Sequence, residues 1–151
     1  VRWCMSIETV VIAVGRDEGA RADRFVEIGE ELAECGASFV VAHVFRTQET
    51  ADKAAAQLDL QDGSASDVAR RLESVRRVRK GFDAAGVDYE VEGLVGDPGK
   101  KISELTGEVG ANRVVVGGRQ RSPTGKAVFG STAQDILMSA QCPVTFVRRE
   151  D

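Results

Sequence analysis

The sequence contains little of what metal centres and disulfide scaffolds need. It has one histidine and three cysteines in 151 residues. Cys4, Cys35 and Cys142 are far apart and no C-x-x-C occurs, so neither a zinc ribbon nor a thioredoxin-like redox pair is available. We therefore expect no metal site and three reduced thiols, as in a cytoplasmic protein. No apolar run approaches the roughly 20 residues of a membrane span, and we expect no membrane partner.

A strong excess of positive charge is also missing. Twenty Lys and Arg against 24 Asp and Glu give a net charge of −4, whereas nucleic-acid binders usually carry a basic excess. The basic run from Arg70 to Lys80 is interpreted as the solvated face of a helix, and we expect no nucleic-acid partner. The length suits one domain over residues 1–151, with residues 1–7 as an N-terminal extension and Met5 near the true start.

What is present is an alternation of β-branched runs with helical apolar spacing. Such alternation predicts a single three-layer α/β sandwich with a five-stranded parallel sheet. Between the second and third strands, the polar stretch 46–66 is predicted as a loop with a short helical turn at Ala54–Leu60. The predicted strands are Glu8–Val14, Ser38–Phe45, Asp88–Leu94, Asn112–Val116 and Pro143–Val147. The predicted helices run from Arg21 to Cys35, from Ser66 to about Ala85, from Asp97 to Gly110, and onward from Gly130.

One loop has the composition of a phosphate site. In open parallel sheets, ligands bind beyond the carboxyl ends of the strands, and the segment from Gly117 to Ser131 follows the fourth strand. It combines glycines, three cations and the start of a helix, whose free N–H groups attract anions. Ala127 stands where a Walker A loop needs a hydroxyl for magnesium, so a P-loop hydrolase is disfavoured. The alternative is an ordinary glycine turn with Ser131 or Thr132 as a helix cap.

This loop resembles the nucleotide motif G-x2-G-x9-G-[ST] of the universal stress protein family, with Gly117, Gly130 and Ser131 in the matching places. The resemblance covers nearly the whole chain, through V-V-I-A-V, V-A-H-V, V-G-D-P, N-R-V-V-V-G-G-R and C-P-V-T-F-V-R in family order. It implies the strand order 3-2-1-4-5 and ATP as cofactor, with or without Mg²⁺. The implied binding residues are Val14, Gly15, Val44, Val116, Gly117, Gly118, Arg119, Gln120, Arg121, Lys126, Gly130, Ser131 and Thr132.

In this scheme Val14 and Val44 touch the base, and the glycine motif holds the phosphates. Two positions depart from the family pattern. Gly15 replaces the acidic residue of V-A-V-D, and Gln120 replaces the second motif glycine, where a Cβ would crowd the phosphates if positive φ is needed. The only histidine, His43, is interpreted as a buried or hydrogen-bonded residue of the second strand, without a catalytic role.

The resemblance thus predicts a cytoplasmic, ATP-binding regulator or sensor of the stress response with no catalytic residues. It also implies a homodimer through the last strand, Val144–Val147. Two alternatives stay open. Gly15 and Gln120 favour a nucleotide-free dimeric interaction module of the same fold, and the cations Arg119, Arg121 and Lys126 would serve a slow Mg²⁺-dependent nucleotide hydrolase.

Overall fold

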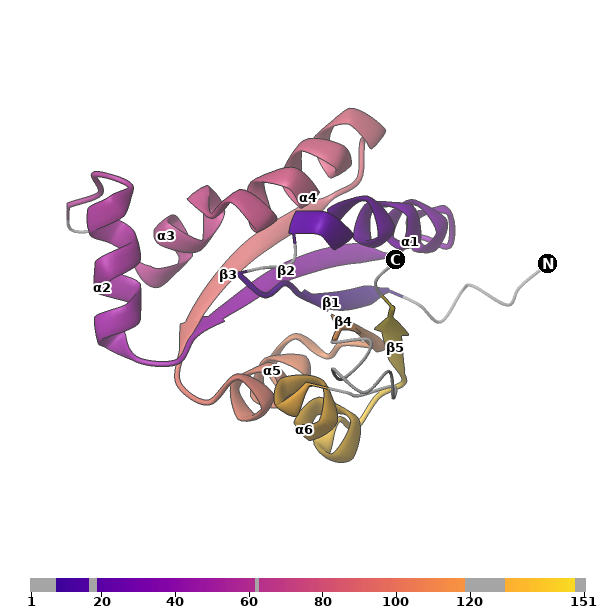
Figure 1. Ribbon diagram of the computed structural model, residues 1–151. Helices are drawn as coiled ribbons and strands as arrows, with labels where there is room; N and C mark the ends of the chain where they lie inside the picture. Colours follow the sequence, from indigo (N-terminus) through magenta and orange to yellow (C-terminus); the bar gives the residue numbers. More distant parts are fainter. Residues whose placement is uncertain (1–7, 17–18, 62, 119–129, 149–151) are drawn as a thin grey trace, which may run out of the picture.

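A five-stranded parallel sheet forms the centre of the protein (Figure 1). The computed structural model describes residues 8–16, 19–61, 63–118 and 130–148. The strands follow the order β3-β2-β1-β4-β5, and each neighbouring pair is parallel. This confirms the predicted fold class and strand order. The strands are β1 (Thr9–Ala13), β2 (Ser38–Phe45), β3 (Tyr89–Val95), β4 (Arg113–Gly117) and β5 (Val144–Val147).

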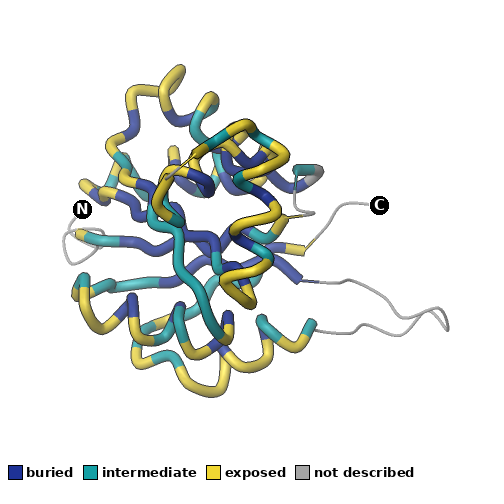
Figure 2. Tube along the Cα trace, turned by 90° about the vertical axis from the view of Figure 1, so that its left-hand side faces the viewer, coloured by how far each residue is buried: buried dark blue, intermediate teal, exposed yellow. Residues whose placement is uncertain are grey.

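Helices cover both faces of the sheet (Figure 1). A short 3-10 turn η1 (Gly19–Arg21), α1 (Ala22–Glu34) and α4 (Glu73–Ala85) lie on one side, while α5 (Pro98–Val109) and α6 (Ser131–Ser139) lie on the other. Because β1 and β2 are buried on both faces, their side chains alternate between two apolar clusters. Phe25, Phe39 and Phe82 belong to the cluster under α1 and α4, and Ile102 and Ile136 belong to the one under α5 and α6. Figure 2 shows the buried strands between exposed outer helix faces.

The connection between β2 and β3 is where the sequence-based prediction is wrong. In place of a loop with one short turn, the stretch 46–66 contains a full helix, α2 (Gln48–Gln57), and the first residues of α3 (Ala65–Arg71). The Thr47 side chain caps α2 by accepting a hydrogen bond from the Thr50 amide at 3.1 Å. Buried Ala51 and Ala54 then fix the inner side of α2 against the core. A polar but alanine-rich sequence is a good helix former once a cap and a buried face are supplied.

The helix predicted from Ser66 to Ala85 is also divided in two. Ser64, not Ser66, caps α3 in a capping box with Asp67, and the backbone at Leu72 is extended (φ −63°, ψ 140°) before α4 begins. Ser66 instead accepts a hydrogen bond from the Gly93 amide at 3.0 Å. A Cβ on Gly93 would lie 2.1 Å from the Ala65 carbonyl oxygen. The close contact of α3 with β3 therefore requires glycine at position 93. The break at Leu72 changes the direction of the chain, so that α4 packs alongside α1.

Other helix ends are as predicted. Asp97 caps α5 by accepting from the Lys100 amide at 3.0 Å, and Pro98 occupies the first turn. Gly86 (φ 70°) and Gly110 (φ 64°) end α4 and α5 in the left-handed conformation that favours glycine.

The expectation of three reduced thiols is wrong for Cys35, which is disulfide-bonded, whereas Cys142 is free. No helix in the described part of the chain is long and apolar enough to cross a membrane. Among the same residues, no group of three or more His, Cys, Asp and Glu side chains is arranged to hold a metal ion. The predicted extension at residues 1–7 lies outside the described residues.

Candidate functional site

A cavity of about 350 Å³ opens at the carboxyl ends of β1, β2 and β4. Within the sheet, β2 and β3 lie on one flank of β1, and the later strands β4 and β5 lie on its other flank. This is the topological switch point, where open α/β sheets bind their ligands. The volume lies within the range of about 300–1,000 Å³ that is typical of small-molecule sites.

Small side chains on adjacent strands create this space. Ala13 of β1 is the register partner of both Ala42 of β2 and Val116 of β4. All three belong to the apolar cluster on the α5–α6 side, and methyl groups at two neighbouring positions leave the volume above them unfilled. Pro98 and Ile102 of α5 form the facing wall. The result is an apolar slot between sheet and helix, suited to a flat, largely apolar ring.

Polar groups surround the mouth of the slot. Arg16 after β1 and Arg46 after β2 are exposed and line it, together with Thr50 of α2. The Arg16 guanidinium donates to the Gln57 side-chain oxygen at 3.2 Å, so it retains further donors. Two guanidinium groups at one mouth favour a ligand with anionic oxygens.

The N-terminus of α6 supplies a second anion-binding feature. Gly130 is the N-cap residue with extended backbone, and no side chain caps the helix. Among the residues that the structure describes, no side chain accepts a hydrogen bond from the first-turn amides, and these amides carry the positive end of the helix dipole. Thr132 in that turn lines the cavity. A Cβ on Gly130 would meet nothing within 4 Å, so this position has room for a side chain.

His43 holds the two central strands together beside the cavity. It is 7% exposed, and its Nδ1 lies 2.8 Å from the Val14 carbonyl oxygen. Burial lowers the pKa of His43, the bond to Val14 opposes that effect, and the charge of Arg16 adds to it. The imidazole is therefore neutral at pH 7 and donates from Nδ1 to the β1 carbonyl. This confirms the interpretation of His43 as a buried, hydrogen-bonded residue.

A buried arginine anchors the start of the glycine-rich segment. Arg21, 8% exposed, donates a hydrogen bond to the carbonyl oxygen of Gly118. A Cβ on Gly118 would lie 2.6 Å from the Phe146 ring. Gly118 is thus placed by packing and by the Arg21 contact, and it does not line the cavity. Sequence reasoning did not single out Arg21, because its contact joins residues 97 positions apart.

The structure brings some predicted site residues together and leaves others outside its description. Val14, Gly15, Val44, Val116, Gly117 and Thr132 line the cavity, and Gly130 and Ser131 stand at the adjoining start of α6. Arg119, Gln120, Arg121 and Lys126 lie outside the described residues. The lining residues that were not predicted as site residues are Ala13, Arg16, Ala42, His43, Phe45, Arg46, Thr50, Pro98 and Ile102. Arg46 could have been predicted, because it directly follows β2. No pattern in the sequence indicates that Pro98 and Ile102 of α5 line the cavity.

The sheet order and the cavity define a doubly wound α/β protein with a hollow of small-molecule size at its switch point. The family follows from comparison of the whole chain. The model of the universal stress protein family matches residues 6–148, so the chain belongs to the universal stress protein family.

Individual relatives agree with this assignment. A curated universal stress protein of Methanocaldococcus jannaschii is 29% identical over 77 residues, which are 51% of this chain and 45% of that protein; the match thus spans less than half of the relative. A universal stress protein structure from Archaeoglobus fulgidus has a TM-score of 0.66 at 28% identity, covering 92% of this chain and 97% of the other. Another from the same organism, solved in complex with dAMP, has a TM-score of 0.63 at 22% identity, with 92% and 96% coverage.

Proposed function

We propose that this protein binds an adenine nucleotide in the cavity at the ends of β1, β2 and β4. The observation that carries the proposal is the pairing of an apolar slot with an uncapped helix N-terminus. The base enters between Ala13, Ala42 and the α5 wall, and the phosphate reaches the first amides of α6. The dAMP complex of the Archaeoglobus fulgidus protein supports this choice of ligand, because that protein has the same fold.

Within that proposal, ATP is the nucleotide that the charges favour. Arg16 and Arg46 line the cavity mouth, and the sequence places three more cations, Arg119, Arg121 and Lys126, in the segment that precedes α6. Such an excess of cations suits a polyphosphate tail more than a single phosphate. Calorimetry with AMP and ATP tests this directly: we expect ATP to bind more tightly, and equal affinities would contradict the assignment.

We further propose that nucleotide binding serves regulation, not hydrolysis. The described residues that line the cavity include no Asp or Glu. No carboxylate in that set is therefore placed to activate a water. Incubation of the protein with MgATP, followed by chromatography of the nucleotide, tests the point. Steady ADP formation that co-purifies with the protein would favour the hydrolase alternative.

Blocking the slot gives the sharpest test of the site. Val44→Phe enlarges a half-buried side chain that lines the cavity. Val109→Phe makes the same change at a half-buried position of α5 that packs on the same apolar cluster but does not line the cavity. In calorimetry with AMP, we expect Val44→Phe to weaken binding at least tenfold and Val109→Phe to leave it unchanged.

Two results of that comparison would contradict the proposal. Equal affinity in the wild type and both variants would place the nucleotide elsewhere on the protein. A wild type that binds neither AMP nor ATP, and that yields no adenine nucleotide to mass spectrometry after denaturation, would favour the nucleotide-free interaction module.

We also propose that the protein forms a homodimer through β5. This strand is at the edge of the sheet, and Val144, Thr145 and Phe146 are only half-buried. Edge strands with apolar side chains are usually paired or covered. Sedimentation at micromolar concentration should show a dimer, and a monomer throughout would contradict the assignment. A cytoplasmic location stays a prediction.

A further inference from the structure

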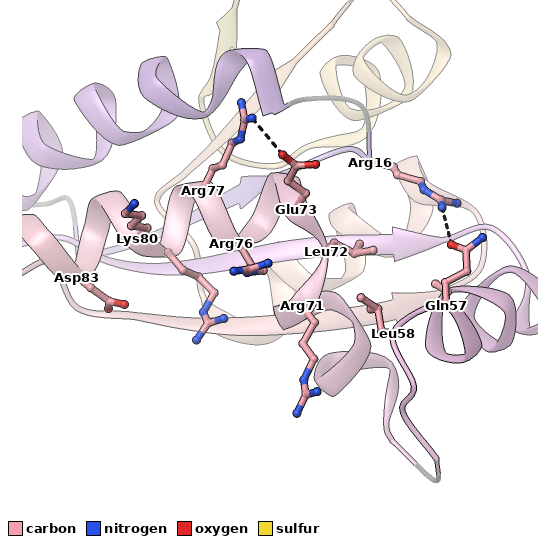
Figure 3. Close-up of a pocket in the computed structure, with 12 residues that line it drawn as sticks. Arg16, Gln57, Leu58, Arg71, Leu72, Glu73, Arg76, Arg77, Lys80 and Asp83 are labelled. Carbon is pink, nitrogen blue, oxygen red and sulfur yellow. Dashed lines mark hydrogen bonds and ion pairs between the residues drawn. The ribbon is translucent and has the colours of Figure 1, made fainter.

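A second and larger hollow lies beside the nucleotide cavity, on the outer side of α4 (Figure 3). Its volume is about 900 Å³, and it is formed by α2, the junction of α3 and α4, and Arg16 after β1. We call it the basic groove. Among the described residues, it is lined by six cations, Arg16, Arg71, Arg76, Arg77, Arg79 and Lys80, and by two carboxylates, Glu73 and Asp83. A local excess of four positive charges thus occurs in a chain whose net charge is −4.

Both carboxylates of the groove already have partners. Glu73 forms an ion pair with Arg77, at 3.0 Å between Oε1 and Nη2. Asp83 accepts a hydrogen bond from the Tyr89 hydroxyl at 2.8 Å. Arg71, Arg76 and Lys80 have no ion pair or hydrogen bond with any residue that the structure describes. The acids in the groove therefore leave most of its positive charge uncompensated.

Arg71, Arg76 and Lys80 are exposed, as the sequence predicts, but the groove cations do not all belong to one helix face. Arg76 and Lys80 are four residues apart on α4, a spacing at which like charges repel and destabilise the helix. Arg71 comes from α3, and the extended backbone at Leu72 brings α3 and α4 to the same groove. Figure 3 shows Arg71, Arg76 and Lys80 distributed along it, with Arg16 at the opposite end beside Gln57. Cations from three separate segments converge on one concavity.

One of these cations is fixed in place. Arg79 is half-buried, and its Nη1 donates to the Arg70 carbonyl oxygen at 2.8 Å. Its Nε is buried and has no hydrogen-bond partner among the described residues. The guanidinium is therefore held rigidly at the groove and retains donor capacity, which lowers the entropy lost when a ligand binds.

We propose that the basic groove is a second binding site, for a linear oligophosphate such as inorganic polyphosphate. Five of its six cations are arginines, whose planar guanidinium groups bind phosphate oxygens through paired hydrogen bonds. No aromatic side chain lines the groove in the described part of the chain, so stacking of nucleic-acid bases has no platform. The described residues contribute only Ala54, Leu58 and Leu72 to its apolar lining, which is too little for the apolar centre of a protein interface.

The basic groove and the nucleotide cavity are separate sites that share one residue. Arg16 lines both hollows, and it donates a hydrogen bond to Gln57, which lines only the basic groove. Oligophosphate binding in the groove does not require that the cavity hold a nucleotide, so the two proposals are tested independently.

The test is calorimetry of the whole protein with inorganic tripolyphosphate and with a longer polyphosphate chain. The double variant Arg71→Gln/Arg76→Gln removes two exposed groove cations. The control Arg70→Gln/Lys100→Gln removes two exposed cations that do not line the groove, so the net charge of the two variants is the same. We expect the groove variant to weaken polyphosphate binding about tenfold, since guanidinium–phosphate contacts are charge-assisted, and to bind AMP as the wild type does. We expect the control to bind polyphosphate as the wild type does.

Several results would overturn the proposal. Equal weakening in both double variants would show only a response to overall charge. Displacement of tripolyphosphate by AMP would place the anion in the nucleotide cavity. Polyglutamate or a single-stranded oligonucleotide that binds as tightly as polyphosphate, and is weakened by the same groove variant, would contradict the assigned ligand class. Circular dichroism melts of both variants exclude unfolding as the cause of any loss.

Discussion

Gly130→Asp is predicted to change nucleotide affinity and protein stability in opposite directions. Gly130 is the N-cap of α6, its backbone is extended (φ −65°, ψ 159°), and a Cβ there meets nothing within 4 Å. Aspartate is a preferred N-cap residue, so its carboxylate will accept from the free amides of the first turn. Those are the amides that the proposed phosphate needs. The variant therefore folds well and carries its own anion in the phosphate position.

The magnitudes differ as well as the signs. An N-cap Asp in place of Gly contributes a few tenths of a kcal/mol, and its charge near the helix dipole contributes about 0.5 kcal/mol more. For a chain of this length that corresponds to a rise in Tm of about 2 °C. Two unit charges 4 Å apart near a protein surface repel by up to about 4 kcal/mol. With solvent screening we take about 2 kcal/mol, which is roughly a thirtyfold loss of AMP affinity.

The assay combines calorimetry with AMP and a thermal melt of the same samples. Gly130→Asn is the matched control, because asparagine also caps the helix but adds no charge. We expect Asn to retain most of the affinity that Asp loses. If Gly130→Asp binds AMP as tightly as the wild type, the phosphate does not lie at the start of α6. If the Asp variant melts well below the wild type, the inference of open space at Gly130 is wrong.

Three further predictions concern stability and protonation. In urea unfolding, Gly29→Ala should destabilise the protein by about 1–3 kcal/mol, because its Cβ would lie 2.4 Å from the buried Phe82 ring. Gly107→Ala is the matched control: its Cβ would meet nothing within 4 Å, so it should stabilise the protein by about 0.5 kcal/mol. If Gly29→Ala were the more stable of the two variants, the close packing of Gly29 against Phe82 would be refuted. The single imidazole signal in NMR should titrate below 6.5, since burial lowers the pKa of His43. Because the unfolded state then binds more protons, stability should fall as pH drops from 6.5 towards the folded pKa, and a titration above 6.5 would contradict this. Thr47→Ala should lose about 1 kcal/mol through the cap of α2, and an unchanged urea midpoint would argue against that cap.

The sheet was predictable because local sequence patterns and general topology rules agree on it. Runs such as Glu8–Val14 and Ser38–Phe45 are β-branched and apolar enough to be buried on both faces. Glycines such as Gly86 and Gly110 mark helix ends that local backbone geometry requires. The connection between β2 and β3 was less predictable. Whether a polar, alanine-rich segment becomes helix or loop depends on a buried face that only the rest of the protein provides.

Some features of the candidate site were likewise predictable from the sequence, and others depend on the tertiary structure. The strand ends at Val14, Gly15, Val44 and Gly117 follow from the rule that ligands bind at the carboxyl ends of parallel strands, and the structure places them around one cavity. The space itself comes from Ala13 and Ala42, whose small size is significant only because they are register partners on adjacent strands. The α5 wall likewise depends on how that helix crosses the sheet.

By itself, then, the sequence determined the strands, the ends of α1 and α5, the start of α6 and the end of the sheet at which the candidate site lies, because each depends on short-range patterns. The tertiary structure alone decided which residues share a surface. It converted the basic run from Arg70 to Lys80 into a groove, by breaking the helix at Leu72 and adding Arg16 from the end of β1. Contacts between residues far apart in the chain depend on the packing of whole elements, and no local pattern encodes them.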